Sequence, residues 1–242
     1  MVKRLNLKKG LVILTILVLL ALLVLASVSP SLRSEIQKGN LQYCEELGWI
    51  NWDHARPDGP REAFRRLQRL NEESEDSFSF TYHQKMVLPL AGAQYVAEVE
   101  ELWKVQSGSR PEELESVFLK VFVSVSNRFE KMQAQGAYAG LAASRESSFR
   151  EGDLTGNLLA FYAAITGEQT ATIQKQLRLF SVDKSLEQLK KEGIGHTKWN
   201  EIEMHCPAGE GICSELNSLM LRIGQDKLGA RLLSGREGFY KK

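Results

Sequence analysis

Residues 78–105, FSFTYHQKMVLPLAGAQYVAEVEELWKV, predict the sheet against which the rest of the domain is built. Apolar residues recur at every second position through Phe78–Leu88 and again through Tyr95–Val105, interrupted by Gln84 in the first run and by Glu101 in the second. This period of two is typical of half-buried strands. The turn-forming residues Pro89 and Gly92 lie between the two runs. The stretch therefore predicts an antiparallel β-hairpin.

The segment after the hairpin predicts a long helix over Pro111–Gln135. Its apolar residues recur at spacings of three and four, which places them on one face directed at a core. Shorter helices are expected over five further segments: Arg61–Glu73, Leu154–Ile165, Thr170–Phe180, Asp183–Lys191 and Ser214–Arg222. Together these elements predict an α+β fold, a helix-rich single exported domain with a small antiparallel sheet.

Two regions outside these elements have weaker patterns. Leu41–Leu47 has the spacing of a helical turn that ends at Gly48, a residue type favoured after the last helical position. The tail from Ile194 onward mixes turn residues with short apolar patches. We expect irregular structure for much of this tail.

An apolar run without charged residues, Leu11–Val28, precedes the domain. It is long enough to cross a hydrocarbon core of about 30 Å. Four Lys and Arg residues precede it, and by the positive-inside rule they keep the N-terminus in the cytoplasm. A cleaved signal peptide is the alternative, but its apolar core is usually shorter. The run therefore favours one uncleaved N-terminal transmembrane helix.

These features predict four consecutive parts of the chain. Residues 1–10 are expected in the cytoplasm, residues 11–29 as the membrane anchor, residues 30–40 as a juxtamembrane stalk and residues 41–242 as an extracytoplasmic globular domain. The N-terminal helix would contact the lipid bilayer, and the exported domain would meet a protein or polymer of the cell envelope.

The charge balance of the chain excludes one class of partner. The sequence has 31 Lys and Arg against 30 Asp and Glu, without a basic cluster in the exported part. A nucleic-acid-binding surface needs clustered excess positive charge. We therefore expect no nucleic-acid partner.

The three cysteines suggest a disulfide in an oxidising compartment. Cys206 and Cys213 enclose the short loop CPAGEGIC and are predicted to form a disulfide, which leaves Cys44 without a cysteine partner. Cys44 could instead pair with one of the other two. Cys206, Cys213 and the adjacent His205 are three potential zinc ligands, but their spacing is not that of a known finger. The disulfide is favoured, and no metal site or cofactor is predicted.

The loop GWINWDHARP is the first candidate functional site. Asp53 and His54 are an acid–base or metal-ligand pair, and Trp49 and Trp52 are candidate binding residues beside them. The structural alternative is that the two Trp rings anchor the loop and His54 caps a carbonyl group.

A second candidate site is ESSFREGDLTGN, residues 146–157. Glu146 and Asp153 are candidate catalytic carboxylates, and Asn157 is a candidate binding residue one helical turn after Asp153. The alternative is that Asp153 is the N-cap of the following helix.

The tetrapeptide Glu146-Ser147-Ser148-Phe149 resembles the catalytic Glu-Ser-x-Phe motif of lytic transglycosylases, enzymes with a lysozyme-like fold that cleave peptidoglycan. The resemblance covers these four residues. The Gly-Leu-Met-Gln stretch that follows in that family is replaced here by Arg150–Asp153 and the residues after it. The chain is therefore not assigned to the family.

The sequence thus predicts a membrane-anchored extracytoplasmic protein that binds a partner or takes part in an assembly. It contains no Gly-rich phosphate loop, no His-Glu-x-x-His and no Gly-x-Ser-x-Gly. The alternative is an envelope hydrolase acting on peptidoglycan or peptides. That reaction requires the fold to bring Asp53 and His54 together with Glu146 and Asp153.

Overall fold

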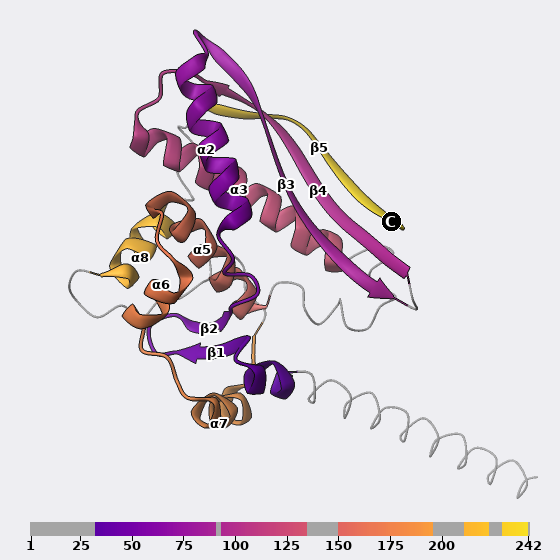
Figure 1. The fold of residues 1–242 in the computed structure, drawn as a ribbon, viewed down its shortest axis with the longest axis vertical. Helices are drawn as coiled ribbons and strands as arrows, with labels where there is room; N and C mark the ends of the chain where they lie inside the picture. The colour runs from indigo at the N-terminus through magenta and orange to yellow at the C-terminus, as the bar shows by residue number, and fades with distance from the viewer. Residues whose placement is uncertain (1–31, 91–92, 135–149, 196–210, 223–228, 242) are drawn as a thin grey trace, which may run out of the picture.

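The structure is a computed structural model and describes residues 32–90, 93–134, 150–195, 211–222 and 229–241 (Figure 1). A helical segment at residues 32–38 comes first. It is followed in chain order by β1 (Leu41–Cys44), β2 (Gly48–Asn51), α2 (Asp58–Glu73), β3 (Ser77–Leu90), β4 (Ala93–Gln106), α3 (Pro111–Ala134), α5 (Glu151–Thr166), α6 (Thr170–Gln176), α7 (Val182–Glu192), α8 (Ile212–Arg222) and β5 (Ala230–Lys241).

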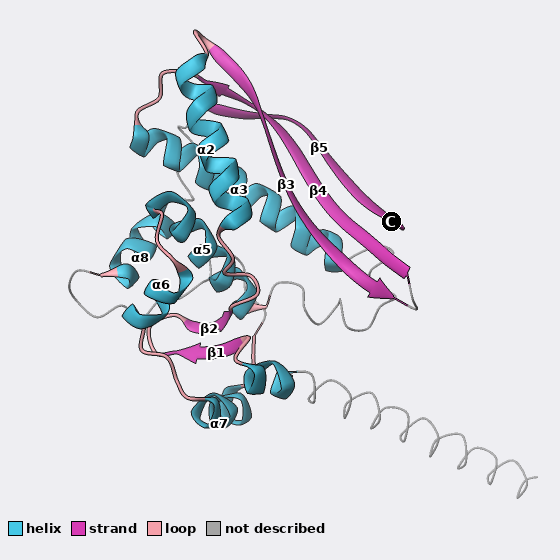
Figure 2. Ribbon diagram, in the orientation of Figure 1, coloured by secondary structure: helices cyan, strands magenta, loops and turns pink. Residues whose placement is uncertain are grey.

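The predicted hairpin is confirmed as β3 and β4, which pair antiparallel with Phe80 opposite Trp103. β5 adds to the other side of β4, also antiparallel, so the strand order is β3-β4-β5. Figure 2 shows this twisted sheet on one side of the molecule, with α3 and α2 beside it. The mixture of helices with small antiparallel sheets confirms the α+β class.

One face of the three-stranded sheet packs on α3 and is lined by large apolar side chains. Phe80, Tyr82 and Trp103 are buried there, as the period of two requires. Phe118 of α3 lies at the centre of the aromatic core, and its ring stacks 5.5 Å from that of Phe161 in α5. The predicted helix over Pro111–Gln135 is confirmed as α3, because its apolar stripe meets both the sheet and α5.

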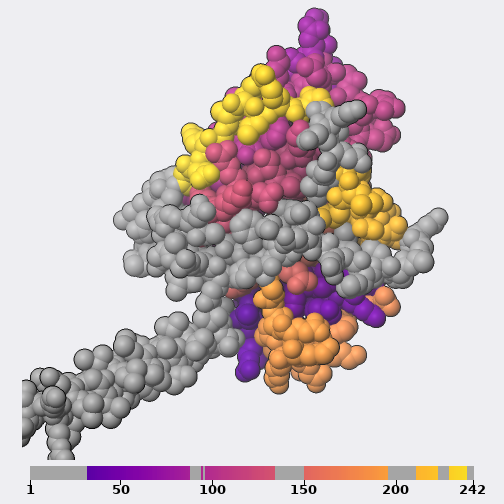
Figure 3. Space-filling view, turned by 180° about the vertical axis from the view of Figure 1, so that it is seen from behind, coloured from indigo at the N-terminus to yellow at the C-terminus, as the bar shows by residue number. Residues whose placement is uncertain are grey.

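A buried charge cluster joins the sheet to α3. Glu101 is 2% exposed and accepts hydrogen bonds from Trp103 Nε1 at 3.0 Å and Ser124 Oγ at 3.1 Å. Arg128 of α3 lies 3.6 Å from the Glu101 carboxylate and donates to Glu237 of β5 at 2.8 Å. The space-filling view from behind shows β5 in yellow next to α3 (Figure 3). Arg128 therefore holds the third strand in place.

The small hairpin of β1 and β2 corrects a prediction. The spacing of Leu41–Leu47 predicts a helical turn, but Leu41–Cys44 pairs antiparallel with Gly48–Asn51. Gly48 has φ 71°, a backbone conformation that glycine adopts without strain. The carboxylate of Glu151 occupies the space where a Cβ atom would lie, so a side chain at this position would clash. The glycine that suggested a helix end is instead the first residue of β2, directly after the hairpin turn.

The other predicted helices end within one residue of their expected ends, with one exception. α5 and α7 end at Thr166 and Glu192, one residue beyond the predicted Ile165 and Lys191, whereas α6 is shorter than the predicted Thr170–Phe180. The tail differs more, because Ala230–Lys241 forms β5 rather than an irregular segment. Residues 231–237 of this edge strand are exposed, so its sequence has no alternation of apolar and polar residues that would predict a strand.

The predicted stalk also contributes to the packing of the domain. Ile36, within residues 32–38, is 1% exposed and belongs to a small apolar cluster with Leu41 and Trp49. Residues 1–31, including the predicted anchor Leu11–Val28, lie outside the described residues.

Two predicted features need correction for the part of the chain that the structure describes. None of the helices there is both long and apolar enough to cross a membrane. α3 is long but carries charges such as Lys120 and Glu130, and α5 is apolar but has 16 residues. No two cysteines within the described ranges form a disulfide. Cys44 is a free, buried thiol, and Cys206 of the predicted pair lies outside those ranges.

Candidate functional site

A cleft of about 570 Å³ lies between the three-stranded sheet and the helices α2, α3 and α5. Its walls come from β3, from the N-terminal half of α2 and the loop before it, and from the middle of α3 and α5. The lining combines apolar side chains with a few polar groups, which is the usual composition of a ligand site. The principal residues are Tyr82, Met86, Phe122, Phe129, His54 and Asn157.

His54 and Asp153, two of the predicted site residues, meet at this cleft. Nε2 of His54 lies 3.8 Å from Oδ1 of Asp153. The side chain of Asp153 is 4% exposed, whereas that of His54 is 26% exposed. Oδ1 of Asp153 accepts a hydrogen bond of 2.8 Å from Nδ2 of Asn51, at the end of β2. The aspartate is thus held in place and His54 is the partner that solvent or a ligand can reach.

Asp153 does not cap α5, contrary to the structural alternative drawn from the sequence. The helix begins at Glu151 after Arg150, and Asp153 lies in its first turn. A carboxylate in the first turn is stabilised by the positive end of the helix dipole. Asp153 therefore has two stabilising influences, the helix terminus and the amide of Asn51.

A glycine in α5 permits the contact between these segments. A Cβ atom added at Gly156 would collide with the carbonyl oxygen of Asn51 and approach Cβ of His54 to 2.8 Å. α5 consequently lies directly against the end of β2 and the loop that carries His54. Any larger residue at this position would separate His54 from Asp153.

Asn157, one turn after Asp153, lines the cleft and is 3% exposed. Its Nδ2 atom has no hydrogen-bond partner among the described residues. A buried amide without a partner costs free energy, so such a group indicates a missing acceptor. An acceptor oxygen of a ligand in the cleft would satisfy it.

Glu35 belongs to the same charged cluster, and sequence reasoning missed it. Burial raises the pKa of its carboxyl group above the ordinary value, and Arg150 opposes that shift. The charges of Asp153 and Asp53 raise the pKa further, while His54 lowers it. Nothing in the local sequence marks this residue, because residues 30–40 have the composition of a polar stalk.

The remaining predicted site residues have structural contacts. Asp53 lines the cleft but forms an exposed ion pair with Arg56. Nε1 of Trp49 donates to the carbonyl group of Gly193 at 3.0 Å, so this ring anchors β2 to the end of α7. Trp52 donates to Gln42 Oε1 at 3.1 Å. Neither Trp lines the cleft, and Glu146 lies outside the described residues.

Among its described residues, the cleft offers the carboxylates of Asp53 and Glu62 as nucleophiles for a covalent hydrolase. No serine, threonine or cysteine is among the described residues that line it. Cys44 is buried and its thiol donates to Glu46 Oε2 at 2.9 Å. Burial and the hydrogen bond to Glu46 raise the pKa of the Cys44 thiol to about 12, so it is an unreactive structural thiol.

The cleft borders the free edge of β3. Residues 82–86 of this strand line it, and among the described strands β3 pairs with β4 alone. The N–H group of Ser107 donates to the carbonyl group of Asp76 at the open end of the hairpin, next to the pair Ser77–Gln106. Backbone groups of alternate residues point to alternate sides of a strand. The even-numbered residues of β3 thus face β4, and the odd-numbered ones face the edge.

The contact between α2 and β3 agrees with this assignment. Arg66 of α2 donates a hydrogen bond to the carbonyl group of Thr81, an odd-numbered residue. It follows that the backbone groups of His83 and Lys85, which line the cleft, also point away from β4. They are hydrogen-bonding groups of an unpaired sheet edge.

One group of side chains among the described residues is able to hold a metal ion. It consists of His83, Glu98 and Glu100, on β3 and β4. No protein-family model matches the chain, and neither the curated proteins nor the solved structures with which it was compared contain a match.

Proposed function

We propose that this protein is a binding or assembly module that takes an extended segment of a partner protein into the cleft beside β3. The segment would pair with the backbone groups of His83 and Lys85 and add a strand to the sheet. The location outside the cytoplasm stays a prediction from the sequence.

The observation that carries this proposal is the free edge of β3 along the cleft. Main-chain hydrogen bonds to an exposed strand edge give affinity for an extended peptide, and side-chain pockets give specificity. Met86 and Phe129 offer apolar surface for the side chains of such a peptide. The unpartnered Nδ2 of Asn157 would donate to one of its oxygen atoms.

The test begins with peptides selected from a random-sequence library for binding to the full chain. For a selected peptide, affinity is measured by fluorescence anisotropy. Binding should slow amide hydrogen exchange at His83 and Lys85, which strand addition protects. Peptides that bind without protecting this edge would contradict the proposal.

Proline substitution separates backbone pairing from side-chain effects. Lys85→Pro removes the outward N–H group and should weaken peptide binding by about tenfold or more. Lys85→Ala keeps that N–H group and should bind with nearly unchanged affinity. Ser79→Pro is the matched control, because Ser79 is exposed on the same strand edge but does not line the cleft. Equal losses in Lys85→Pro and Ser79→Pro would refute strand addition.

A hydrolase is the second candidate, and the cluster of Glu35, His54 and Asp153 favours it. A carboxyl group with a raised pKa beside other carboxylates is a common general acid. Labelled peptidoglycan and labelled casein, incubated with the full chain, would each report turnover. Activity lost in both Glu35→Gln and His54→Ala would favour the hydrolase. Binding of these substrates without their hydrolysis would favour the binding module over the hydrolase.

A further inference from the structure

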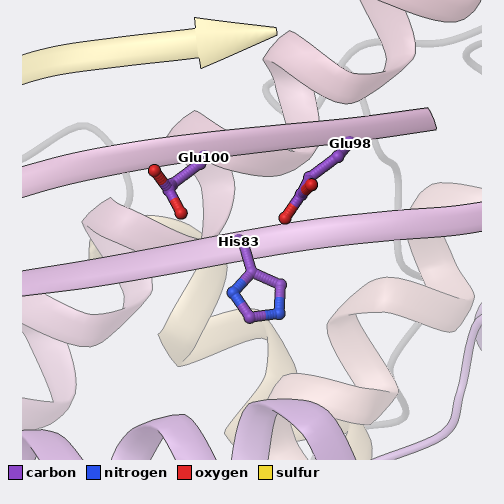
Figure 4. Close-up of side chains that lie close together, drawn as sticks. All are labelled: His83, Glu98 and Glu100. Atoms are coloured by element: carbon purple, nitrogen blue, oxygen red, sulfur yellow. The ribbon is translucent and has the colours of Figure 1, made fainter. Parts of the chain in front are cut away.

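Three metal-ligating side chains lie together on the face of the sheet opposite α3. His83 of β3 and Glu100 of β4 are cross-strand partners, and Glu98 is two residues from Glu100. Because side chains alternate between the faces of a sheet, these three share one face. Figure 4 shows both carboxylates extending from β4 toward β3, where His83 is attached. The cluster is therefore produced by the register of the hairpin.

The separations suit a single small ion. One ligand atom from each side chain lies within 4.8 Å of the other two. Nitrogen and oxygen ligands about 2.1 Å from a tetrahedral zinc ion are separated by about 3.4 Å. Rotation of the exposed His83 ring and of the two carboxylates can close this difference without movement of the backbone. β4 is paired on both sides, so the strand that supplies two ligands is rigid.

The donor set selects among metals. Calcium requires six or more oxygen ligands, and magnesium prefers oxygen ligands and retains its waters. An imidazole nitrogen with two carboxylates suits zinc, which accepts three protein ligands and a water molecule.

The cluster already has charged neighbours that a metal ion must displace. Arg236 of β5 lies 3.2 Å from the Glu100 carboxylate, and Glu98 also interacts with a neighbouring group. The side chain of Arg236 is 72% exposed, so this ion pair is weak. A divalent ion is a stronger partner for two carboxylates than one exposed guanidinium group.

We propose that His83, Glu98 and Glu100 bind one zinc ion on the outer face of the sheet, with an open coordination position for water. This site shares His83 with the proposed peptide cleft, but zinc would bind the side chain of His83 on the outer face, whereas a peptide would pair with its backbone at the strand edge. Peptide binding and zinc binding can therefore fail separately.

The direct test is calorimetric titration of the metal-free full chain with zinc chloride. One equivalent of zinc should bind to the wild type at this site, and His83→Ala should weaken that binding by at least about tenfold. Glu98→Gln and Glu100→Gln should each weaken it as well, since they remove charge without changing shape. Ser79→Ala, at an exposed position on the same face of β3 as His83, is the matched control and should bind zinc as the wild type does. Unchanged zinc binding in His83→Ala would overturn the proposal.

Two further measurements distinguish this site from cysteine ligation and from nonspecific attraction of the ion to the acidic surface. Cobalt bound in place of zinc should show no thiolate-to-metal charge-transfer band, whereas such a band would assign the ion to cysteine and overturn the proposal. Arg236→Ala should strengthen zinc binding severalfold because it frees the Glu100 carboxylate. Arg231→Ala removes the same charge from the same strand. Equal gains in the two variants would show general electrostatic attraction and would contradict the site.

Discussion

Nε2 of His54 lies 3.8 Å from Oδ1 of Asp153, and the same oxygen accepts a hydrogen bond of 2.8 Å from Asn51. The first residue follows β2 and the second belongs to the first turn of α5. The contact therefore links the small hairpin to the central helix at the edge of the cleft. It also brings together two segments that the sequence presents as separate candidate sites.

Asn51→Ala should destabilise the protein by about 1.5–3 kcal/mol, the usual contribution of a hydrogen bond to a charged group. The substitution removes the amide that donates to the buried carboxylate of Asp153. Urea denaturation followed by circular dichroism measures the change in unfolding free energy. Asn217→Ala, at an exposed position of α8, is the control and should change stability by less than about 0.5 kcal/mol. Similar stability of the two variants would show that Asp153 does not depend on Asn51.

Gly156→Ala should destabilise the protein by about 1–3 kcal/mol, although alanine is the better helix former. The added methyl group would collide with the carbonyl oxygen of Asn51 and with the loop at His54. Gly59→Ala is the matched control in α2, where an added Cβ meets nothing within 4 Å. This control should stabilise the protein by up to about 1 kcal/mol. Effects of the same sign in both variants would refute the close approach of α5 to β2.

The thiol of Cys44 should resist alkylation by iodoacetamide in the folded protein at pH 8. Burial and its hydrogen bond to Glu46 raise its pKa to about 12, so the reactive thiolate is scarce. Mass spectrometry after a time course should show modification of Cys44 only when urea is present. Rapid labelling of Cys44 in the absence of urea would contradict its burial.

The raised pKa of Cys44 also predicts the response of stability to alkaline pH. The folded state favours the neutral thiol, so its contribution is fully present below the ordinary pKa of about 9 and is lost as pH rises toward about 12. The wild type should lose unfolding free energy over this range more steeply than Cys44→Ala. Parallel pH profiles of the two proteins would contradict this linkage.

Glu35→Gln should raise stability at neutral pH. Burial, with the nearby charges of Asp153 and Asp53, raises the pKa of Glu35 despite the opposing charge of Arg150. The folded state therefore prefers the protonated carboxyl group, so stability falls as pH rises above the ordinary pKa of about 4.5, and the full cost is reached above the folded pKa. The advantage of the glutamine variant should disappear below about pH 4, which thermal unfolding at several pH values would show. Glu187→Gln, on the exposed side of α7, should show no such advantage.

The elements that were predicted correctly are those in which burial follows a simple period. β3 and β4 alternate because one face packs on α3, and α3 has its apolar stripe because it meets the sheet and α5. α5 and α7 end close to their predicted ends, where Gly167 and Gly193 follow, because glycine readily adopts positive φ. These signals are local, so they can be read directly from the order of residues in each segment.

The elements that were missed are those without a local signal. β5 is an edge strand with residues 231–237 exposed, and it is held by pairing to β4 and by Arg128. β1 and β2 are too short to show a period, and their pairing depends on the turn at Gly48. Long-range pairing of this kind is decided by packing partners that lie far away in the chain.

The candidate site divides in the same way. The sequence alone marked His54, because it follows Asp53 in a loop with two Trp residues, and it marked Asp153 and Asn157, because they lie one helical turn apart at the start of a predicted helix. Only the tertiary structure placed His54 and Asn157 in one cleft and brought Asp153 against His54. It also added Glu35 from the predicted stalk to this charged cluster and placed both Trp49 and Trp52 in supporting contacts instead. Residue type is a property of the chain, whereas proximity between β2 and α5 requires the close packing that Gly156 permits.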